Sequence, residues 1–340
     1  MAVEKNDYIG GASVSRVLHE GWTYSNCSYV CSLLRPEIFR DLNLQKYGLQ
    51  VLPYGGSVNF MQNGDIYGGY SDEDLLRREM GRFSKRDADA YVRFARDVSR
   101  QCRFIKPMLM RTPPDPTSFK PKDLGELIYL FKRLYSLGEQ TIYDTIRFYT
   151  MSVAEYLEEY FETDIVKATL SGSGIIGTGL GPYSPGTAYV LLHHYMGEVD
   201  GSIGSWGFAR GGMGSIANAL ADAFKDYDGE LLTDAEVSQI IVKGGRAKGV
   251  VLSNGDEYYA KNIVSNLDVK RTYQKLFDPK DLSEKILKQV DNFKIRGSSG
   301  KLNIALDGVP EFPALGKNNP LMYADMHFID SLERMERAYD

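Results

Sequence analysis

The clearest pattern of apolar and polar positions lies between Glu230 and Asp268. Three strand-like runs occur there, at Val237–Val242, Gly249–Leu252 and Glu257–Tyr259. They are separated by Gly244-Gly245 and by Asn254-Gly255. Such pairs supply the positive φ angles that tight hairpin turns require. The sequence therefore predicts a three-stranded antiparallel meander.

A helical pattern precedes the meander. Between Gly214 and Phe224 the apolar residues recur at a spacing that places them on one face of a helix: Ile216, Ala217, Leu220, Ala221 and Phe224. A further short strand is expected after the meander, at Asn262–Asn266. This order of helix, meander and strand suits a mixed α/β domain better than an all-helical one.

The stretch from Ser71 to Tyr160 has a charged, helix-period sequence. Ser71–Asp74 predicts a helix N-cap with acidic residues in the first turn. Further helices are expected at Asp87–Ile105, Leu124–Leu137 and Val153–Phe161, and a charged helix from Asp330 onward. Four prolines between Arg111 and Pro121 interrupt the pattern and predict a linker or surface loop.

Composition adds mainly exclusions to this picture. The chain has 340 residues, 43% hydrophobic and 25% charged, which is typical of a globular protein of one or two domains. Its net charge of −5 shows no basic footprint, so nucleic acid is not expected as a partner. Cys27, Cys31 and Cys102 complete neither a disulfide framework nor a metal site, so no metal is expected.

The start of the chain carries the first segment of chemical interest. Glu4 is followed after five residues by Gly10-Gly11. In a dinucleotide-binding fold, an acidic residue at the end of the second strand accepts hydrogen bonds from the ribose, and glycines let the backbone approach the pyrophosphate. The same residues also suit an ordinary strand end and turn, so this pattern alone leaves both interpretations open.

Two other glycine-rich segments differ in their position relative to helices. Gly172–Gly177 has the form G-x-G-x-x-G, but it comes after a helix-like stretch and precedes further glycines and prolines. Because a dinucleotide loop must open a helix, we reject this segment as the cofactor loop. Gly211–Gly214 does open a helix. Its amides would suit a phosphate or a flavin carbonyl, or its glycines would only permit close packing.

The remaining candidates are weaker. His193 and His194 are adjacent, so their side chains point in different directions and do not form a ready pair of ligands. The 23 tyrosines would suit either an apolar substrate tunnel or ordinary core and interface positions. No catalytic residue is assigned from these patterns.

Taken together, the segments resemble the phytoene-desaturase-like branch of the FAD-dependent amine oxidase superfamily. Four segments carry the resemblance in family order: Val3–Ser13, Ser32–Ile38, Trp206–Ala221 and Ile263–Asp268. The resemblance implies FAD as cofactor and a mixed α/β fold. It further implies an incomplete FAD-binding Rossmann-like domain that contains the meander, and a mostly helical substrate-binding domain.

The resemblance also implies a division of the chain and a set of cofactor contacts. Residues 1–70 and 201–270 would form the FAD-binding domain, and residues 71–200 and 271–340 the substrate-binding domain. Glu4 would bind the adenosine ribose, and Val237 would pair its backbone with the adenine. Gly10, Gly11, Ala12 and Ser13 would run beside the pyrophosphate and ribityl chain.

Two departures from the family matter. Its members look to begin with a strand and a G-x-G-x-x-G loop about 20 residues before the position of Glu4, and to end with a glycine-rich segment over the flavin. This chain contains neither segment. We therefore expect a fragment truncated at both ends, which binds FAD poorly or not at all.

The function implied by the resemblance is oxidation of a largely apolar small molecule by a desaturase or dehydrogenase that uses FAD. The main alternative is a non-catalytic, flavoprotein-like scaffold that binds a lipid or a protein partner. A nicotinamide-dependent dehydrogenase is disfavoured, because the inserted meander is by resemblance a flavoprotein feature. Peripheral membrane contact, oligomeric state and compartment are left open; the compartment would be cytoplasmic in a bacterium and mitochondrial in a eukaryote.

Overall fold

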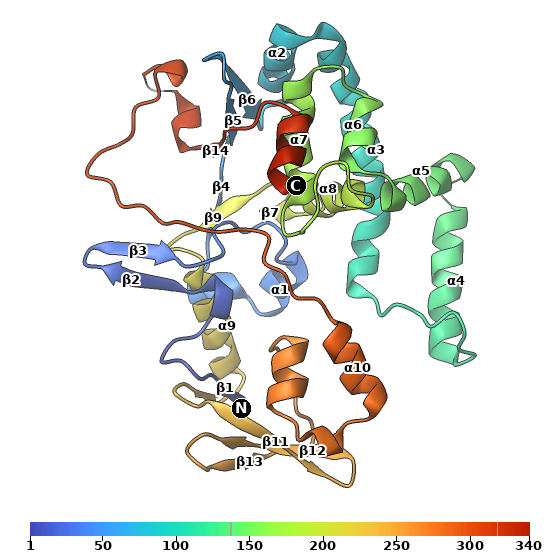
Figure 1. Cartoon of the computed structure of the whole chain (residues 1–340), viewed down its shortest axis with the longest axis vertical. Coiled ribbons are helices and arrows are strands. Elements are labelled where there is room, and N and C mark those ends of the chain that lie inside the picture. Colours follow the sequence, from blue (N-terminus) through green and yellow to red (C-terminus); the bar gives the residue numbers. More distant parts are fainter. Residues whose placement is uncertain (137, 318) are drawn as a thin grey trace. The chain divides into compact units, whose positions relative to one another are not determined.

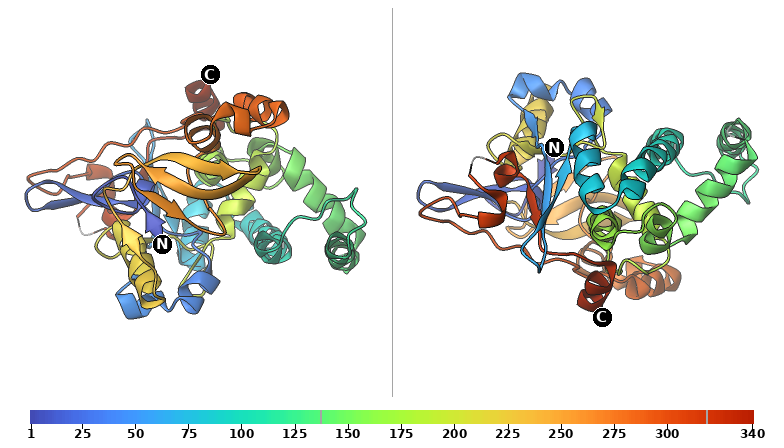
Figure 2. Two further views of the ribbon diagram at one scale, coloured as in Figure 1. Left: turned by 90° about the horizontal axis from the view of Figure 1, so that it is seen from below. Right: turned by 90° about the horizontal axis from the view of Figure 1, so that it is seen from above.

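The structure, a computed structural model, has a mixed α/β fold with many helices and several small sheets (Figures 1 and 2). It describes residues 1–136, 138–317 and 319–340. Leu137, the last residue of one predicted helix, lies outside the described residues. The mixed fold class expected from the sequence is confirmed.

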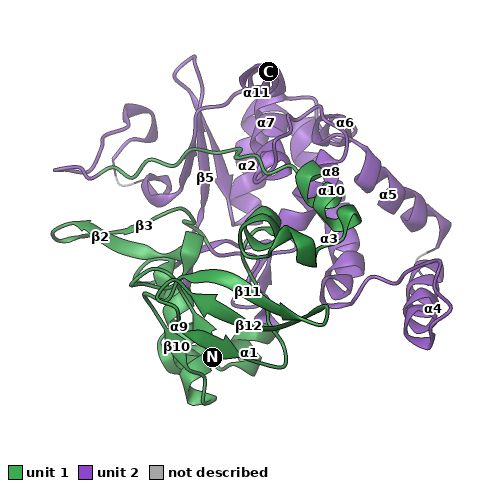
Figure 3. Ribbon diagram, turned by 60° about the horizontal axis from the view of Figure 1, so that its bottom comes forward, with its two compact units in different colours: residues 1–30, 37–50, 209–304 green, residues 31–36, 51–208, 305–340 purple. Residues whose placement is uncertain are grey.

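The chain divides into two compact units (Figure 3). Unit 1 contains residues 1–30, 37–50 and 209–304, and unit 2 contains residues 31–36, 51–208 and 305–340. These boundaries differ from the expected ones at 51–70, where β5 (Gly56–Phe60) pairs with β6 (Ile66–Tyr70) and with β14 (Asp325–His327). They also differ at 271–304, where the Leu276 carbonyl accepts a hydrogen bond from the Ile240 amide of the meander. The assignment of FAD and substrate to separate domains remains a prediction.

Unit 1 is built from short strands and a few helices. Its strands are β1 (Ala2–Val3), β2 (Ser15–His19), β3 (Trp22–Ser25), β10 (Leu231–Leu232), β11 (Val237–Lys243), β12 (Arg246–Leu252) and β13 (Glu257–Tyr259). Its helices are α1 (Pro36–Asp41), α9 (Gly214–Asp226) and α10 (Glu284–Asn292), with single helical turns at Gly11–Ser13, Leu44–Tyr47, Arg271–Lys275 and Pro279–Asp281. β1 pairs with β10 in parallel, and β2 pairs with β3 antiparallel.

Unit 2 is mostly helical. Its helices are α2 (Glu73–Phe83), α3 (Lys85–Ile105), α4 (Pro121–Tyr135), α5 (Glu139–Thr150), α6 (Val153–Glu158), α7 (Asp164–Ile175), α8 (Thr187–Tyr195) and α11 (Leu332–Tyr339), with short turns at Lys106–Met110, Pro313–Leu315 and Pro320–Tyr323. Its strands are β4 (Val51–Pro53), β5 (Gly56–Phe60), β6 (Ile66–Tyr70), β7 (Glu198–Val199), β8 (Ser202–Ile203), β9 (Gly207–Ala209) and β14. β5 lies between β6, its antiparallel hairpin partner, and β14, its parallel partner.

The meander forms as a sheet in the order β11-β12-β13, antiparallel throughout. Gly244, Gly245 and Gly255 have positive φ angles of 60°, 70° and 92°, as the turns require. Asn254 was expected to share this conformation and does not. Its side chain instead accepts a hydrogen bond from the Asp256 amide at 3.0 Å, which shapes the turn from the side chain.

One other expectation for unit 1 is wrong, and a second holds only in part. Residues 262–266 form no strand, and the Val264 side chain is 89% exposed; no strand pairs with this segment among the described residues. On α9, Ile216 of the expected face is buried and the other four expected residues are half-buried. The fully buried positions also include Ala219 and Ala223, whose small side chains allow close approach.

The main core of unit 2 is a large hydrophobic cluster around α3, α6 and α8, and a smaller cluster contains Val58, Leu315 and Leu321. Phe94, Val98, Leu157, Leu191 and Leu192 are almost completely buried in the large cluster. The predicted helices around residues 87–105 and 124–135 and after residue 330 are confirmed, but the helix that begins at Val153 ends at Glu158, before the expected residue. The predicted proline-rich loop also forms, and Pro121 begins α4, where its missing amide costs no hydrogen bond.

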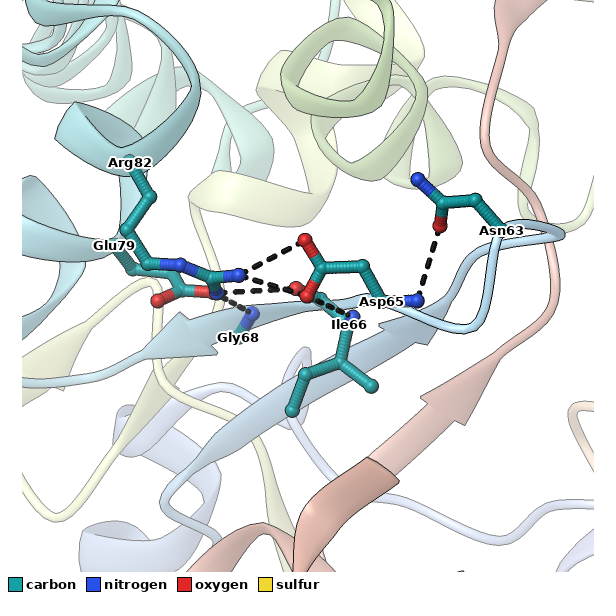
Figure 4. A network of polar contacts seen from close by, with 6 residues as sticks. All are labelled: Asn63, Asp65, Ile66, Gly68, Glu79 and Arg82. Atoms are coloured by element: carbon teal, nitrogen blue, oxygen red, sulfur yellow. Dashed lines mark hydrogen bonds and ion pairs between the residues drawn. The ribbon is translucent and has the colours of Figure 1, made fainter. Parts of the chain in front are cut away.

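A polar network fastens the β5–β6 hairpin to α2 (Figure 4). The Arg82 guanidinium donates to both carboxylate oxygens of Asp65, at 2.7 and 2.9 Å, and to Glu79 Oε1 at 2.6 Å. Glu79 in turn accepts a hydrogen bond from the Gly68 amide at 3.1 Å. The bonds from Arg82 lower the pKa of the Asp65 carboxyl, so this ion pair persists to acidic pH.

Candidate cofactor site

Glu4 occupies the end of β1 in unit 1, where its backbone is fixed on both sides. Its amide donates to the Leu232 carbonyl and its carbonyl accepts from the Ala235 amide, both at 2.8 Å. Its carboxylate Oε1 accepts hydrogen bonds from the Asn6 amide at 2.9 Å and from Asn6 Nδ2 at 2.8 Å. Among the described residues nothing donates to Oε2. The half-buried carboxylate is thus held by one oxygen and can accept a hydrogen bond through the other.

The glycine turn Gly10–Ser13 comes after Glu4 and a short loop. Gly10 and Gly11 have positive φ angles of 113° and 52°, and a single 3₁₀ turn begins at Gly11. A Cβ at Gly10 would lie only 3.0 Å from the Cβ of Ala217 on α9, so glycine is required there for packing as well as for conformation. In the described part of the chain, the amides of Gly10, Gly11 and Ala12 have no acceptor. Consecutive free amides of this kind form an anion-binding concavity.

The glycine run Gly211–Gly214 at the start of α9 has the opposite character. Met213 donates its amide to Ser25 Oγ at 3.0 Å, and Gly214 donates its amide to Ser15 Oγ at 2.9 Å. The next two amides, of Ser215 and Ile216, bond to backbone carbonyls within the same turn. A Cβ at Gly214 would lie 2.7 Å from the Ser15 amide nitrogen. The glycines therefore serve close packing here, and the amides from Gly212 to Ile216 are all already bonded to acceptors within the chain.

Val237 begins β11, two residues after Ala235, whose amide bonds to Glu4. It pairs with Leu252, and the register of the ladder shifts directly after it. The structure therefore brings Val237 and Glu4 onto adjoining segments of unit 1. The glycine turn joins the same unit through its contact with α9.

The other glycine motif and the two histidines lie in unit 2. Gly172 and Gly174 lie inside α7, close to its end, so the G-x-G-x-x-G segment closes a helix instead of opening one. On α8, the Nδ1 of His194 donates to the Val190 carbonyl at 2.9 Å, and its ring stacks on Trp206. Burial lowers the pKa of His193. These histidines are structural residues of the helix and its packing.

A small, mainly apolar cavity of about 280 Å³ also lies in unit 2. It is lined by Val98, Cys102, Pro107, Tyr195 and Ile203, with Lys106 at its edge in an ion pair with Glu198. Burial raises the pKa of the Cys102 thiol to about 12, so the thiol is protonated at neutral pH and is not a nucleophile. The cavity can hold an apolar group without reacting with it.

Metal-ligand clusters and membrane-spanning helices are both lacking among the described residues. No group of three or more His, Cys, Asp or Glu side chains is gathered there to hold a metal ion. All three cysteines are free thiols. None of the described helices has the length and apolar character needed to cross a bilayer.

Comparison with protein families identifies the family to which the chain belongs. The family described as flavin containing amine oxidoreductase matches residues 72–326, most of the chain. The chain belongs to this family. The family match supports FAD as the cofactor, as the resemblance implied.

Individual relatives agree with the family. The chain is 31% identical over 331 residues to pyridine nucleotide-disulfide oxidoreductase domain-containing protein 2 of Mus musculus, covering 92% of this chain and 56% of the relative. It is 26% identical over 220 residues to the neurosporene-forming phytoene desaturase of Rhodobacter capsulatus, covering 64% and 38% of the two chains. The chain therefore spans little more than half the length of the mouse relative.

A solved structure supports the fold of the chain. An oxidoreductase from Methanosarcina mazei superposes with a TM-score of 0.52 at 14% identity, over 85% of this chain and 58% of the other. At this identity the likeness concerns the fold alone.

Sequence reasoning missed two residues that decide the character of the site. Ser15 and Ser25 close the start of α9, and nothing in the sequence marks a serine so far from the helix as its cap. Asn6, which orients the Glu4 carboxylate, could have been predicted from the sequence. An asparagine two residues after an acid commonly forms such a local bond.

Proposed function

We propose that this chain is part of an FAD-dependent oxidoreductase of the desaturase or dehydrogenase type, with a largely apolar substrate. The observation that carries the proposal is the row of free amides at Gly10, Gly11 and Ala12 beside the anchored Glu4, in a chain of the flavin amine oxidoreductase family. Two of the relatives are phytoene desaturases, which supports the choice of substrate class.

Glu4 would hold the adenosine ribose through its carboxylate. Asn6 occupies Oε1 and leaves Oε2 as an acceptor for a ribose hydroxyl. Since the Glu4 backbone is bonded on both sides, the carboxylate needs little reorganisation to bind. The Val237 backbone, on the adjoining segment, would contact the adenine.

The glycine turn would hold the pyrophosphate. The amides of Gly10, Gly11 and Ala12 can donate to phosphate oxygens, and positive φ at the two glycines presents successive amides on one side. Ser13 at the end of this turn would continue toward the ribityl chain. The start of α9 is not part of this proposed pyrophosphate site, because Ser15 and Ser25 already accept hydrogen bonds from its amides.

Unit 2 would supply the substrate side. Its apolar cavity at Val98, Cys102 and Ile203 suits part of a hydrocarbon chain, and its thiol is held protonated by burial. FAD, when bound, supplies the hydride acceptor. The protein's own part is then to position the substrate and exclude water, which requires no acid or base from this chain. We therefore name no catalytic residue.

The cofactor part of the proposal is tested by titrating the 340-residue chain with FAD and, separately, with ADP. We expect weak binding of both, because the chain's proposed contacts are with the ADP half. Glu4→Gln should weaken both affinities about tenfold, since a hydrogen bond to a charged acceptor is lost. Glu20→Gln, an exposed acid in the β2–β3 turn, is the matched control. A folded chain that binds neither ligand would contradict the assignment.

The alternative function is a scaffold that binds a lipid or protein partner without turnover. The two are separated by the spectrum of the protein saturated with FAD. A flavin absorption band that bleaches when an apolar substrate is added without oxygen supports the oxidoreductase. A folded protein whose flavin band is unchanged when the apolar substrate is added favours the scaffold.

A further inference from the structure

A groove lined by arginines lies on unit 2, between α3 and the end of α4. Its volume is about 640 Å³, and its charged lining consists of Arg96, Arg100, Arg103 and Arg133 against one carboxylate, Glu73. The three arginines of α3 recur at i, i+4 and i+7, so they share one helix face. In a chain with a net charge of −5, this is a concentrated region of positive charge.

The arginines differ in how far they are already paired. Arg133 donates to the carbonyls of Phe104 and Arg103, at 3.2 and 2.8 Å, which fixes its guanidinium at the groove. Arg96 lies 4.0 Å from Asp97. Within the described residues, Arg100 and Arg103 have no carboxylate partner at ion-pair distance. Free guanidinium groups beside a fixed one suit bidentate binding of phosphate oxygens.

α4, which contributes Arg133 to the groove, leaves a second surface uncovered. The side chains of Leu124, Ile128, Phe131 and Tyr135 are 40%, 55%, 68% and 78% exposed, and their spacing places them on one side of the helix. Figures 1 and 2 show α4 at the margin of unit 2, away from its other helices except near the ends of α4. Such a stripe of large apolar side chains is costly to leave in water.

α4 is held to unit 2 by residues outside this stripe. Leu134 packs on the edge of the core cluster, and Glu126 forms an ion pair with Arg111 at 2.8 Å. Helical spacing puts Arg133 on a different side of α4 from the exposed apolar residues. The side of α4 opposite the exposed apolar residues carries Lys122 and Arg133 together with Glu126. An apolar side opposed to a charged side that includes Lys and Arg is typical of helices that lie in the interface of a bilayer.

We propose that the arginine groove binds the phosphate of an anionic lipid headgroup, with the exposed apolar side of α4 inserted into the bilayer surface. Charge complementarity identifies the ligand as an anion, and the apolar stripe on the same helix identifies the source as a lipid and not a free phosphate. The groove is larger than a single phosphate needs, which leaves room for the rest of a headgroup.

The test is cosedimentation of the 340-residue chain with vesicles of phosphatidylcholine alone and of phosphatidylcholine mixed with phosphatidic acid. We expect binding to the anionic vesicles, and little to the neutral ones. Arg100→Gln with Arg103→Gln should weaken that binding about fivefold for each charge removed. Ile128→Ser with Phe131→Ser should weaken it about tenfold or more, because two inserted apolar side chains are lost.

The matched control removes two charges elsewhere. Arg246→Gln with Lys248→Gln changes exposed residues of β12 and should leave vesicle binding within about twofold of the unchanged chain. All three pairs of substitutions are at exposed or groove positions, and circular dichroism checks that each variant is folded.

Three outcomes would overturn the proposal. Equal binding to neutral and anionic vesicles would show that the arginine groove does not bind an anionic headgroup. Displacement of the chain from vesicles by inorganic phosphate at the concentration of the lipid phosphate would indicate a free-anion site. Absence of binding to either vesicle would mean that a protein surface, and not a bilayer, covers α4.

Discussion

The glycine turn at Gly10–Ser13 and the glycine run at Gly211–Gly214 have similar compositions but opposite uses. In the first, three amides point to no acceptor in the described chain, and a Cβ at Gly11 would meet no atom within 4 Å. In the second, the amides bond to Ser15, Ser25 and the local backbone, and a Cβ at Gly214 would collide with Ser15. Glycine content thus does not determine whether a turn can bind an anion. What decides is whether nearby hydroxyl groups already accept hydrogen bonds from its amides.

The sharpest test of this difference is Gly214→Ala. The added Cβ would lie 2.7 Å from the backbone nitrogen of Ser15, which cannot move independently, so we expect a loss of about 2–3 kcal/mol in the free energy of unfolding. Urea unfolding measures it. Gly81→Ala in α2 is the control: nothing lies within 4 Å of its added Cβ, and it should stabilise by about 0.5–1 kcal/mol. Equal effects of the two changes would contradict the packing role.

A smaller effect is expected from removing the two hydroxyl caps. Ser15→Ala and Ser25→Ala each take an acceptor from an amide at the start of α9, which should cost about 1 kcal/mol each. The double variant then carries two freed amides at a helix end. If its affinity for ADP rises above that of the unchanged chain, the closed run has been opened into an anion site. An unchanged unfolding free energy would show that water replaces the serines without loss.

The smallest change in stability is expected at Gly11. Gly11→Ala meets no neighbour, so its cost is the positive φ of 52° alone, about 1 kcal/mol. Gly10→Ala should cost more, because its Cβ also approaches Ala217 to 3.0 Å. Adding Ala217→Gly to Gly10→Ala relieves that contact and should recover part of the loss. If urea unfolding gives the reverse order for the two glycines, the turn does not pack on α9 through Gly10.

Sequence reasoning succeeded where local chemistry decides the structure. The turn glycines of the meander and the cap at Asp72, within the predicted Ser71–Asp74, are readable because each acts on residues next to it in the chain. The helical face of α3 with Phe94 and Val98 was readable for the same reason. The prediction of FAD came from the segments that resemble the family, because no residue spacing in this chain specifies the cofactor.

Most failures involve partners that are distant in sequence. The strand expected at 262–266 has the right composition but pairs with no strand among the described residues. The fully buried positions of α9 were misjudged because its main neighbour, the turn at Leu44–Tyr47, lies far away in the chain. The groove formed by Arg96, Arg100 and Arg103 with Arg133 likewise appears only in the structure.

The pairing of β14 with β5 carries a consequence for the order in which the protein assembles on the ribosome. Asp325–His327 must reach Ser57–Asn59, so one edge of the β5–β6 hairpin stays uncovered until β14 has been synthesised much later. An open strand edge can pair with another chain in the meantime. We therefore expect nascent chains released before residue 325 to aggregate more than chains that include β14, which light scattering of the two would measure.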